Sequence, residues 1–122
     1  MQDLIRLKEL LYSALYNASG LTCYDMKVPI YSPFPYIVFK ITSSSNFNRN
    51  RTDYIVELDY WTDSNNQSSL SSAMISVKNN FNYRYHSEND IMFQSHVEFE
   101  AEIIEIEENI SHFKQRYLLK VR

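Results

Sequence analysis

The clearest pattern along the chain is a period-two alternation over residues 53–63, which read DYIVELDYWTD. One side of this pattern carries the apolar and aromatic residues Tyr54, Val56, Leu58 and Tyr60. Alternation of this length, rich in β-branched and aromatic side chains, predicts a central strand with both faces partly covered. Asp, Ser and Asn residues follow at once and favour a turn or a helix cap. The strand is therefore expected to lead directly into a helix.

Two segments have the spacing of amphipathic helices. Residues 2–18 repeat apolar side chains at helical intervals, and Gly20 follows where a left-handed residue often ends a helix. Residues 66–82 carry a second apolar stripe, while their other positions are mostly Ser, Asn, Gln and Lys. Such a one-sided stripe predicts a helix that covers one sheet face and exposes its other side to water.

The rest of the pattern predicts strands. We expect four main strands, near residues 35–42, 53–62, 92–107 and 112–121. A short edge strand is expected near residues 27–31, in the connector that holds all three prolines. In the third main strand the alternation slips by one position at Ile103 and Ile104, which predicts a β-bulge or a strong bend there. The glutamates of that strand are expected to face the lysines and arginines of the last strand, so that charge sets their register.

These elements predict an α+β fold with one domain over residues 1–122. The expected architecture is one antiparallel β-sheet of about four strands, two amphipathic helices packed on one face, and a long C-terminal β-hairpin. The predicted core joins both helical stripes to one sheet face: Leu7, Leu11, Leu15, Ile37, Phe39, Val56, Leu58, Leu70, Met74, Val77, Phe81, Phe99 and Tyr117. Loop 43–52 offers little apolar area to offset the entropy of ordering, so we expect it to be mobile.

Composition narrows the possible chemistry. A single glycine excludes a glycine-rich phosphate loop, and one cysteine, Cys23, excludes a disulfide framework within the chain. The net charge of −3 argues against a protein whose whole surface binds DNA. The three histidines lack the spacing of metal ligands, and no apolar run approaches the ~20 residues of a transmembrane helix. We therefore expect no catalytic, cofactor-binding or metal-binding residues, no enzyme activity, no small-molecule substrate and no membrane contact.

Two polar features leave alternatives open. The glutamates between residues 98 and 108 suit an acid–base pair or a cation site, but alternation also explains them as a solvated strand face. Loop 43–52 is the chain's one locally basic loop, and it holds Arg49 and Arg51 with Phe47 beside them. These three residues form a candidate surface for DNA phosphates or for a protein partner, and the alternative is an ordinary polar loop.

Three apolar residues have no obvious place in the predicted core. Tyr31, Ile55 and Trp61 remain after the helices have covered one sheet face, and Ile55 and Trp61 lie among acids. An apolar patch rimmed by charge is typical of a subunit interface. These residues therefore predict an interface on the second face of the central strand.

Two stretches carry a resemblance to a known family. Residues 34–39 read FPYIVF after a helix and a proline-containing connector, and residues 56–67 read VELDYWTDSNNQ and run straight into a helix. In this combination the chain resembles the tail completion proteins of long-tailed bacteriophages, also called tail terminator or head-to-tail joining proteins. The resemblance covers residues 2–82, and the C-terminal hairpin fits in type only.

The resemblance implies an α+β subunit without catalytic residues that forms a ring, usually a hexamer, on the end of the tail tube. Such a protein is expected in the host cytoplasm during assembly and in the tail end or neck of the virion afterwards. Its implied partners are copies of itself, the tail tube protein and the head connector or stopper protein, with DNA passing through the ring. The alternative is a small nucleic-acid-binding or regulatory protein.

Overall fold

The computed structural model describes residues 2–30, 32–48, 50–88, 91–105 and 109–122, with the side chains of all but residues 2, 3, 47 and 48. The elements are α1 (Gln2–Ser19), β1 (Thr22–Asp25), β2 (Tyr36–Asn48), β3 (Arg51–Asp63), the short 3-10 helix η1 (Ser64–Asn66), α2 (Gln67–Phe81), β4 (Arg84–Glu88), β5 (Ile91–Ile103) and β6 (Ile110–Val121). Over these residues the strands form one sheet in the order β1-β2-β3-β6-β5-β4. All neighbours are antiparallel except β1 and β2, which are parallel. The α+β class is confirmed, but the sheet has six strands in the described part of the chain, where about four were expected.

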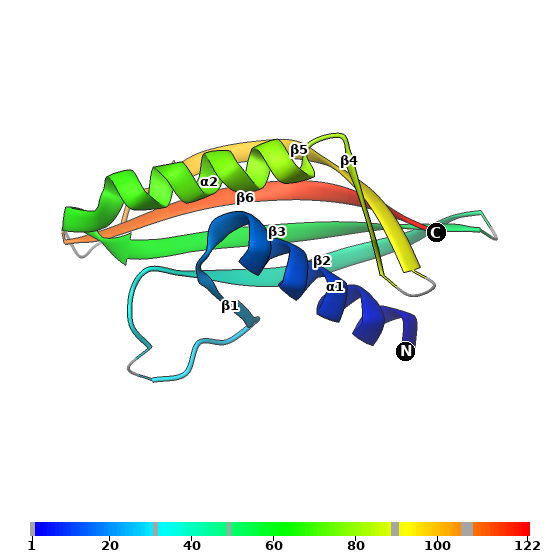
Figure 1. Ribbon diagram of the computed structural model, residues 1–122, viewed down its shortest axis with the longest axis horizontal. Coiled ribbons are helices and arrows are strands. Elements are labelled where there is room, and N and C mark those ends of the chain that lie inside the picture. The colour runs from blue at the N-terminus through cyan, green and yellow to red at the C-terminus, as the bar shows by residue number, and fades with distance from the viewer. Residues whose placement is uncertain (1, 31, 49, 89–90, 106–108) are drawn as a thin grey trace.

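Both helices lie on the same face of the curled sheet (Figure 1). The buried residues of α2 are Leu70, Ala73, Val77 and Phe81, which repeat at helical spacing. In α1, Leu7, Leu11 and Leu15 are buried. Both helices therefore bury one apolar stripe against the sheet. Their outer sides are mostly polar but also expose Ile5, Tyr12 and Tyr16 in α1 and Ile75 in α2.

The core lies between the helices and one sheet face. Eleven of the thirteen predicted core residues are buried: Leu7, Leu11, Leu15, Ile37, Phe39, Val56, Leu58, Leu70, Val77, Phe81 and Tyr117. Met74 is partly buried against the same cluster. Phe99 was predicted wrongly, because its side chain is 43% exposed. The aromatic side chain that β5 contributes to the core is Phe93, which is fully buried.

A β-bulge explains this error. The ladder between β5 and β6 shifts register between Val97 and Phe99, whereas the bulge was expected at residues 103–104, where β5 in fact ends. An extra residue in one strand sends every later side chain to the opposite face. Phe99 consequently pairs with Arg116 on the face without helices, while Glu100 pairs with Gln115 on the helix-covered face. The predicted pairing of acidic β5 with basic β6 is therefore wrong.

The polar loop and the edge strand also differ from expectation. Most of loop 43–52 is strand: β2 runs to Asn48, and Ser43 and Ser45 pair with residues of β3. The backbone ladder and polar contacts, such as the hydrogen bond from Thr52 Oγ1 to Asn46 Oδ1, join the two strands of this hairpin, and its mobility stays a prediction. The edge strand forms at Thr22–Asp25 and not at residues 27–30, the described part of the expected range 27–31. Among the described residues, no helix is long and apolar enough to span a membrane.

Candidate interaction surface

The sheet face opposite the helices carries alternate residues of β2, β3, β6 and β5, and we call it the open face. Cross-strand partners form three adjacent rows on it: Tyr36, Trp61, His112 and Ile103; Val38, Asp59, Lys114 and Ala101; Lys40, Glu57, Arg116 and Phe99. Acids of β3 thus lie beside bases of β6 in the middle of the face. The lateral margins carry Tyr36, Val38 and Lys40 on the β2 side, and Ile103, Ala101 and Phe99 on the β5 side.

The acids and bases in the middle of the open face neutralise one another. Lys114 Nζ lies 3.0 Å from Glu57 Oε2 and 3.7 Å from Asp59 Oδ1. Arg116 Nη2 lies 3.5 Å from Glu57 Oε1. The hydrogen bond to Glu57 raises the pKa of Lys114, although partial burial opposes this. The basic strand therefore takes its partners from the central strand, and these pairs help to fix the register between β3 and β6.

His112 joins this charged group to the hairpin tip, the segment that follows β5 and includes Ile104 and Glu105. The residue is buried, and its Nε2 lies 2.7 Å from Asp59 Oδ1. Its Nδ1 lies 2.7 Å from Glu105 Oε1. Because ionised carboxylates only accept hydrogen bonds, both ring nitrogens can donate only when the imidazole is protonated. The Trp61 ring stacks on this imidazole with centroids 3.7 Å apart and planes inclined by 14°.

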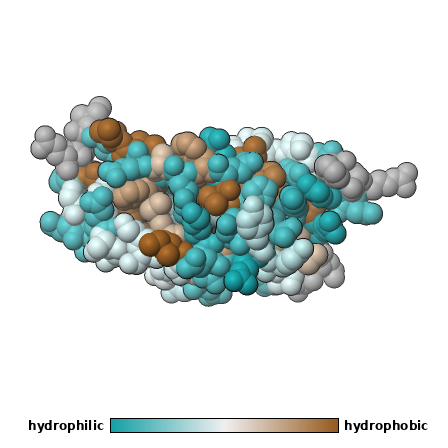
Figure 2. Space-filling view, turned by 90° about the horizontal axis from the view of Figure 1, so that it is seen from above, coloured by the Kyte–Doolittle hydropathy of each residue, from teal (hydrophilic) through white to brown (hydrophobic). Residues whose placement is uncertain are grey.

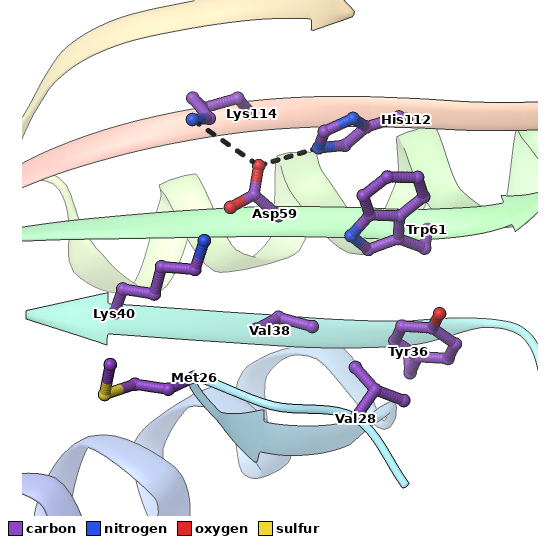
Figure 3. A pocket seen from close by; sticks show the side chains of 9 residues that line it. All are labelled: Met26, Val28, Tyr36, Val38, Lys40, Asp59, Trp61, His112 and Lys114. Atoms are coloured by element: carbon purple, nitrogen blue, oxygen red, sulfur yellow. Dashed lines mark hydrogen bonds and ion pairs between the residues drawn. The ribbon is translucent and has the colours of Figure 1, made fainter. Parts of the chain in front are cut away.

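A pocket of about 360 Å³ opens beside this group (Figure 3). Its lining residues are Met26, Val28, Tyr36, Val38, Lys40, Asp59, Trp61, His112 and Lys114. Met26 and Val28 follow β1 and form one wall, while the other residues come from the open face. In Figure 3 the Lys40 side chain extends from β2 toward β3. No described residue forms an ion pair or a hydrogen bond with the Lys40 ammonium group, so the pocket combines apolar walls with one cation that has no partner among the described residues.

The structure brings together only part of the predicted interface. Ile55 and Trp61 are partly buried and both lie on the open face, where Ile55 pairs with Leu118. Trp61 has more cover than the sequence suggested, because it stacks on His112. Tyr31 lies outside the described residues.

The predicted basic loop is also described only in part. Arg49 lies outside the described residues, as does the side chain of Phe47. Arg51 forms two hydrogen bonds to Asp53, with Nε–Oδ1 at 2.7 Å and Nη2–Oδ2 at 2.9 Å. These bonds hold the pKa of Asp53 below its usual range despite partial burial. Arg51 is thus engaged within the β2–β3 hairpin, and its contact with DNA or a partner stays a prediction.

Sequence reasoning missed the functional potential of several residues. His112, Lys40 and Met26 were not singled out, since nothing in their local sequence marks them and only the strand order brings them together. The thiol of Cys23 is buried, and burial raises its pKa to about 12, so it is a poor nucleophile. The described residues include no group of three or more His, Cys, Asp or Glu side chains arranged to hold a metal ion.

Comparison with known proteins identifies the fold. A chain in the solved structure of the virion of a native gene transfer agent particle matches 94% of this chain and 93% of its own length. The two have a TM-score of 0.68 and 10% sequence identity. The fold is shared with a virion protein. A second solved protein, whose name states no function, matches 100% of this chain and 96% of its own length at a TM-score of 0.68 and 9% identity. No protein-family model and no curated protein matches the sequence.

Proposed function

We propose that this protein is a structural subunit of a virion that caps the tail tube and joins the tail to the head connector as a ring of identical copies. The observation that carries the proposal is the shared fold, which spans nearly the whole of both this chain and the gene transfer agent virion chain. The resemblance of residues 2–82 to tail completion proteins rests on sequence motifs and points to the same role. The proposed partners are further copies of the chain, the tail tube protein and the head connector or stopper protein.

The open face supports a role in assembly. Its apolar and charged residues are arranged across four strands that no helix covers, and Ile55 and Trp61 lie among them. A rigid sheet face of this kind suits a protein–protein contact, because the side chains are already held in position before binding. We propose accordingly that the protein is not an enzyme and acts through its surfaces.

The nucleic-acid-binding alternative gains less support. Its sequence argument depended on Arg49 and Arg51 as free cations, and Arg51 instead forms a bidentate ion pair with Asp53. The acids and bases in the middle of the open face are likewise paired with one another. A continuous basic track for a phosphate backbone is therefore not evident on the described part of the sheet.

The test is deletion of the gene for this protein from the genome that encodes the particle. Electron micrographs of lysates without the protein are expected to show separate heads and tails, with tails of abnormal length. Supplying the wild-type chain in trans should restore joined particles. Normal numbers of joined particles with tails of normal length in its absence would contradict the proposal.

A further inference from the structure

The hairpin tip presents an isoleucine to solvent. Ile104 follows β5 directly and is 94% exposed. Its neighbours on both sides are anchored: Ile103 pairs with His112, and Glu105 accepts a hydrogen bond from the same histidine. Such an arrangement holds an apolar side chain in a fixed, exposed position, which lowers the entropy cost of burying it in a partner. In Figure 2, hydrophobic groups lie scattered among hydrophilic residues on the face seen from above.

The pocket on the open face has the properties of a receptor for such a side chain. Met26, Val28 and Val38 supply apolar walls, and Trp61 supplies an aromatic one. Lys40 lies at the pocket without an ion-pair partner among the described residues. An occupant that carries an apolar side chain close to a carboxylate would match both features.

The tip and the pocket lie at the same end of the sheet but toward opposite edges. One row of paired residues runs from Tyr36, Trp61 and His112, which all line the pocket, to Ile103 at the base of the tip. The connector after β1 and the C-terminal end of β5 lie at the same end of the sheet in Figure 1. In a ring whose axis runs roughly along the strands, the tip of one copy and the pocket of the next copy would lie at the same height along that axis. Such a contact uses two different surfaces and can close into a ring.

We infer that Ile104 of one copy inserts into the open-face pocket of the next copy. Charge favours this occupant, because opposite charges would meet in the contact. The exposed Glu102 lies two residues before Ile104, and Lys40 lines the pocket of the neighbouring copy. The inference rests on the ring of the proposed function and names the two surfaces that form it.

Disulfide trapping tests the contact directly. Ile104→Cys and Met26→Cys are made separately and together in a Cys23→Ala background, and the purified proteins are oxidised with copper phenanthroline. Met26 is 59% exposed at the rim of the pocket, so its substitution should not disturb the core. The two single variants, mixed, should form a cross-linked dimer that neither forms alone. The double variant should form a ladder of linked oligomers.

Ile5→Cys combined with Met26→Cys is the matched control. Ile5 is also exposed, at 57%, but it lies in α1 near the end of the molecule opposite the tip (Figure 1). No ladder from the Ile104 pair, or an equal ladder from the Ile5 pair, would overturn the contact. A single doubly linked dimer from the double variant would also overturn it, since that product indicates two-fold pairing.

A second measurement uses no cysteine. Ile104→Asp should raise the protein concentration needed for half-maximal assembly by about tenfold or more, because it puts a charge where the proposed contact buries an isoleucine. Ile5→Asp should leave that concentration unchanged. If rings form at wild-type concentrations with Ile104→Asp, the contact is wrong while the proposed function stands. Failure of the virion experiment would instead refute the function, whatever the trapping result.

Discussion

Replacing Gln115 by Leu should destabilise the protein through the groups it leaves without partners. Gln115 is fully buried on the helix-covered side of β6. Its Oε1 accepts a 2.5 Å hydrogen bond from the Tyr60 hydroxyl and a 3.3 Å bond from the Tyr117 hydroxyl. Its Nε2 donates to Glu100 Oε1 at 2.8 Å. Burial raises the pKa of Tyr60 well above its ordinary value, so this hydroxyl is a donor at every working pH.

The expected loss is about 2–4 kcal/mol of unfolding free energy. Leaving the buried Tyr60 hydroxyl without an acceptor costs roughly 1–3 kcal/mol, and losing the bond to Glu100 costs about 1 kcal/mol more. Glu100 keeps its other partner, since Lys78 Nζ lies 3.0 Å from its Oε2. Urea denaturation followed by circular dichroism measures the loss as a lower midpoint at an unchanged slope.

A double-mutant cycle isolates the hydrogen bond itself. Tyr60→Phe should destabilise the wild type but cost much less in the Gln115→Leu background, because the hydroxyl already lacks its partner there. Tyr54→Phe is the control, since no described residue forms a hydrogen bond with the Tyr54 hydroxyl and its effect should simply add. Additive losses for Tyr60 and Gln115, within about 0.3 kcal/mol, would refute the reasoning.

Three further predictions concern stability. Leu58→Ala and Phe81→Ala should cost about 2–5 kcal/mol each through lost burial and residual cavities, and an unchanged denaturation midpoint would place either residue outside the core. The pKa of Asp53 is lowered in the folded protein, so its carboxylate stabilises the fold at pH values above the ordinary aspartate pKa. This contribution is lost as the pH falls through the lower folded-state pKa, and Asp53→Asn should therefore flatten the acid side of a stability–pH curve. An unchanged curve would contradict the ion pair with Arg51. His112→Ala should cost about 1–3 kcal/mol and shift the fluorescence of Trp61, because it removes the contacts with Asp59 and Glu105 and the stacked ring, so an unchanged spectrum would argue against the stacking.

The long periodic elements could be predicted from the sequence. The helix expected over residues 2–18 is Gln2–Ser19, and the central strand expected near 53–62 is Arg51–Asp63. In both, the buried side chains repeat at the period of the element, so local sequence carries the information. The strands β1 and β4 carry no such signal: β4 has a largely exposed pattern of polar and aromatic residues and lies at the edge of the sheet. Its pairing with β5 is what makes it a strand.

The bulge in β5 could not be located from the sequence. Val97, Phe99, Ala101 and Ile103 alternate with glutamates without interruption, so the pattern predicts a regular strand through this region. The extra residue at position 98 reverses the faces without changing the alternation. Glu100 then meets Lys78 of α2, and the hydrogen bonds from Lys78 and Gln115 hold its pKa below the usual range although burial alone would raise it. Contact with a helix, and not local pattern, decides which way this strand faces.

The candidate surface depends even more on long-range pairing. Asp59 and His112 are 53 positions apart in the chain, and only the register between β3 and β6 brings them within 2.7 Å. The sequence did indicate Ile55 and Trp61 as residues of a second face, because alternation alone separates them from the core. It could not show that Trp61 has a ring to stack on, or that Met26 would close a pocket beside it.

The charge pairing on the open face bears directly on self-assembly. Identical subunits of net charge −3 repel one another unless their contact surfaces are locally neutral. The acids of β3 are neutralised within the sheet, where Glu57 and Asp59 both lie near Lys114. The margins of the face carry apolar residues, with Val38 on the β2 side and Phe99 on the β5 side, and the β2 margin also carries Lys40. A sheet face that is neutral in its middle, with apolar residues and one lysine at its margins, can meet an identical neighbour of net negative charge side by side at little electrostatic cost.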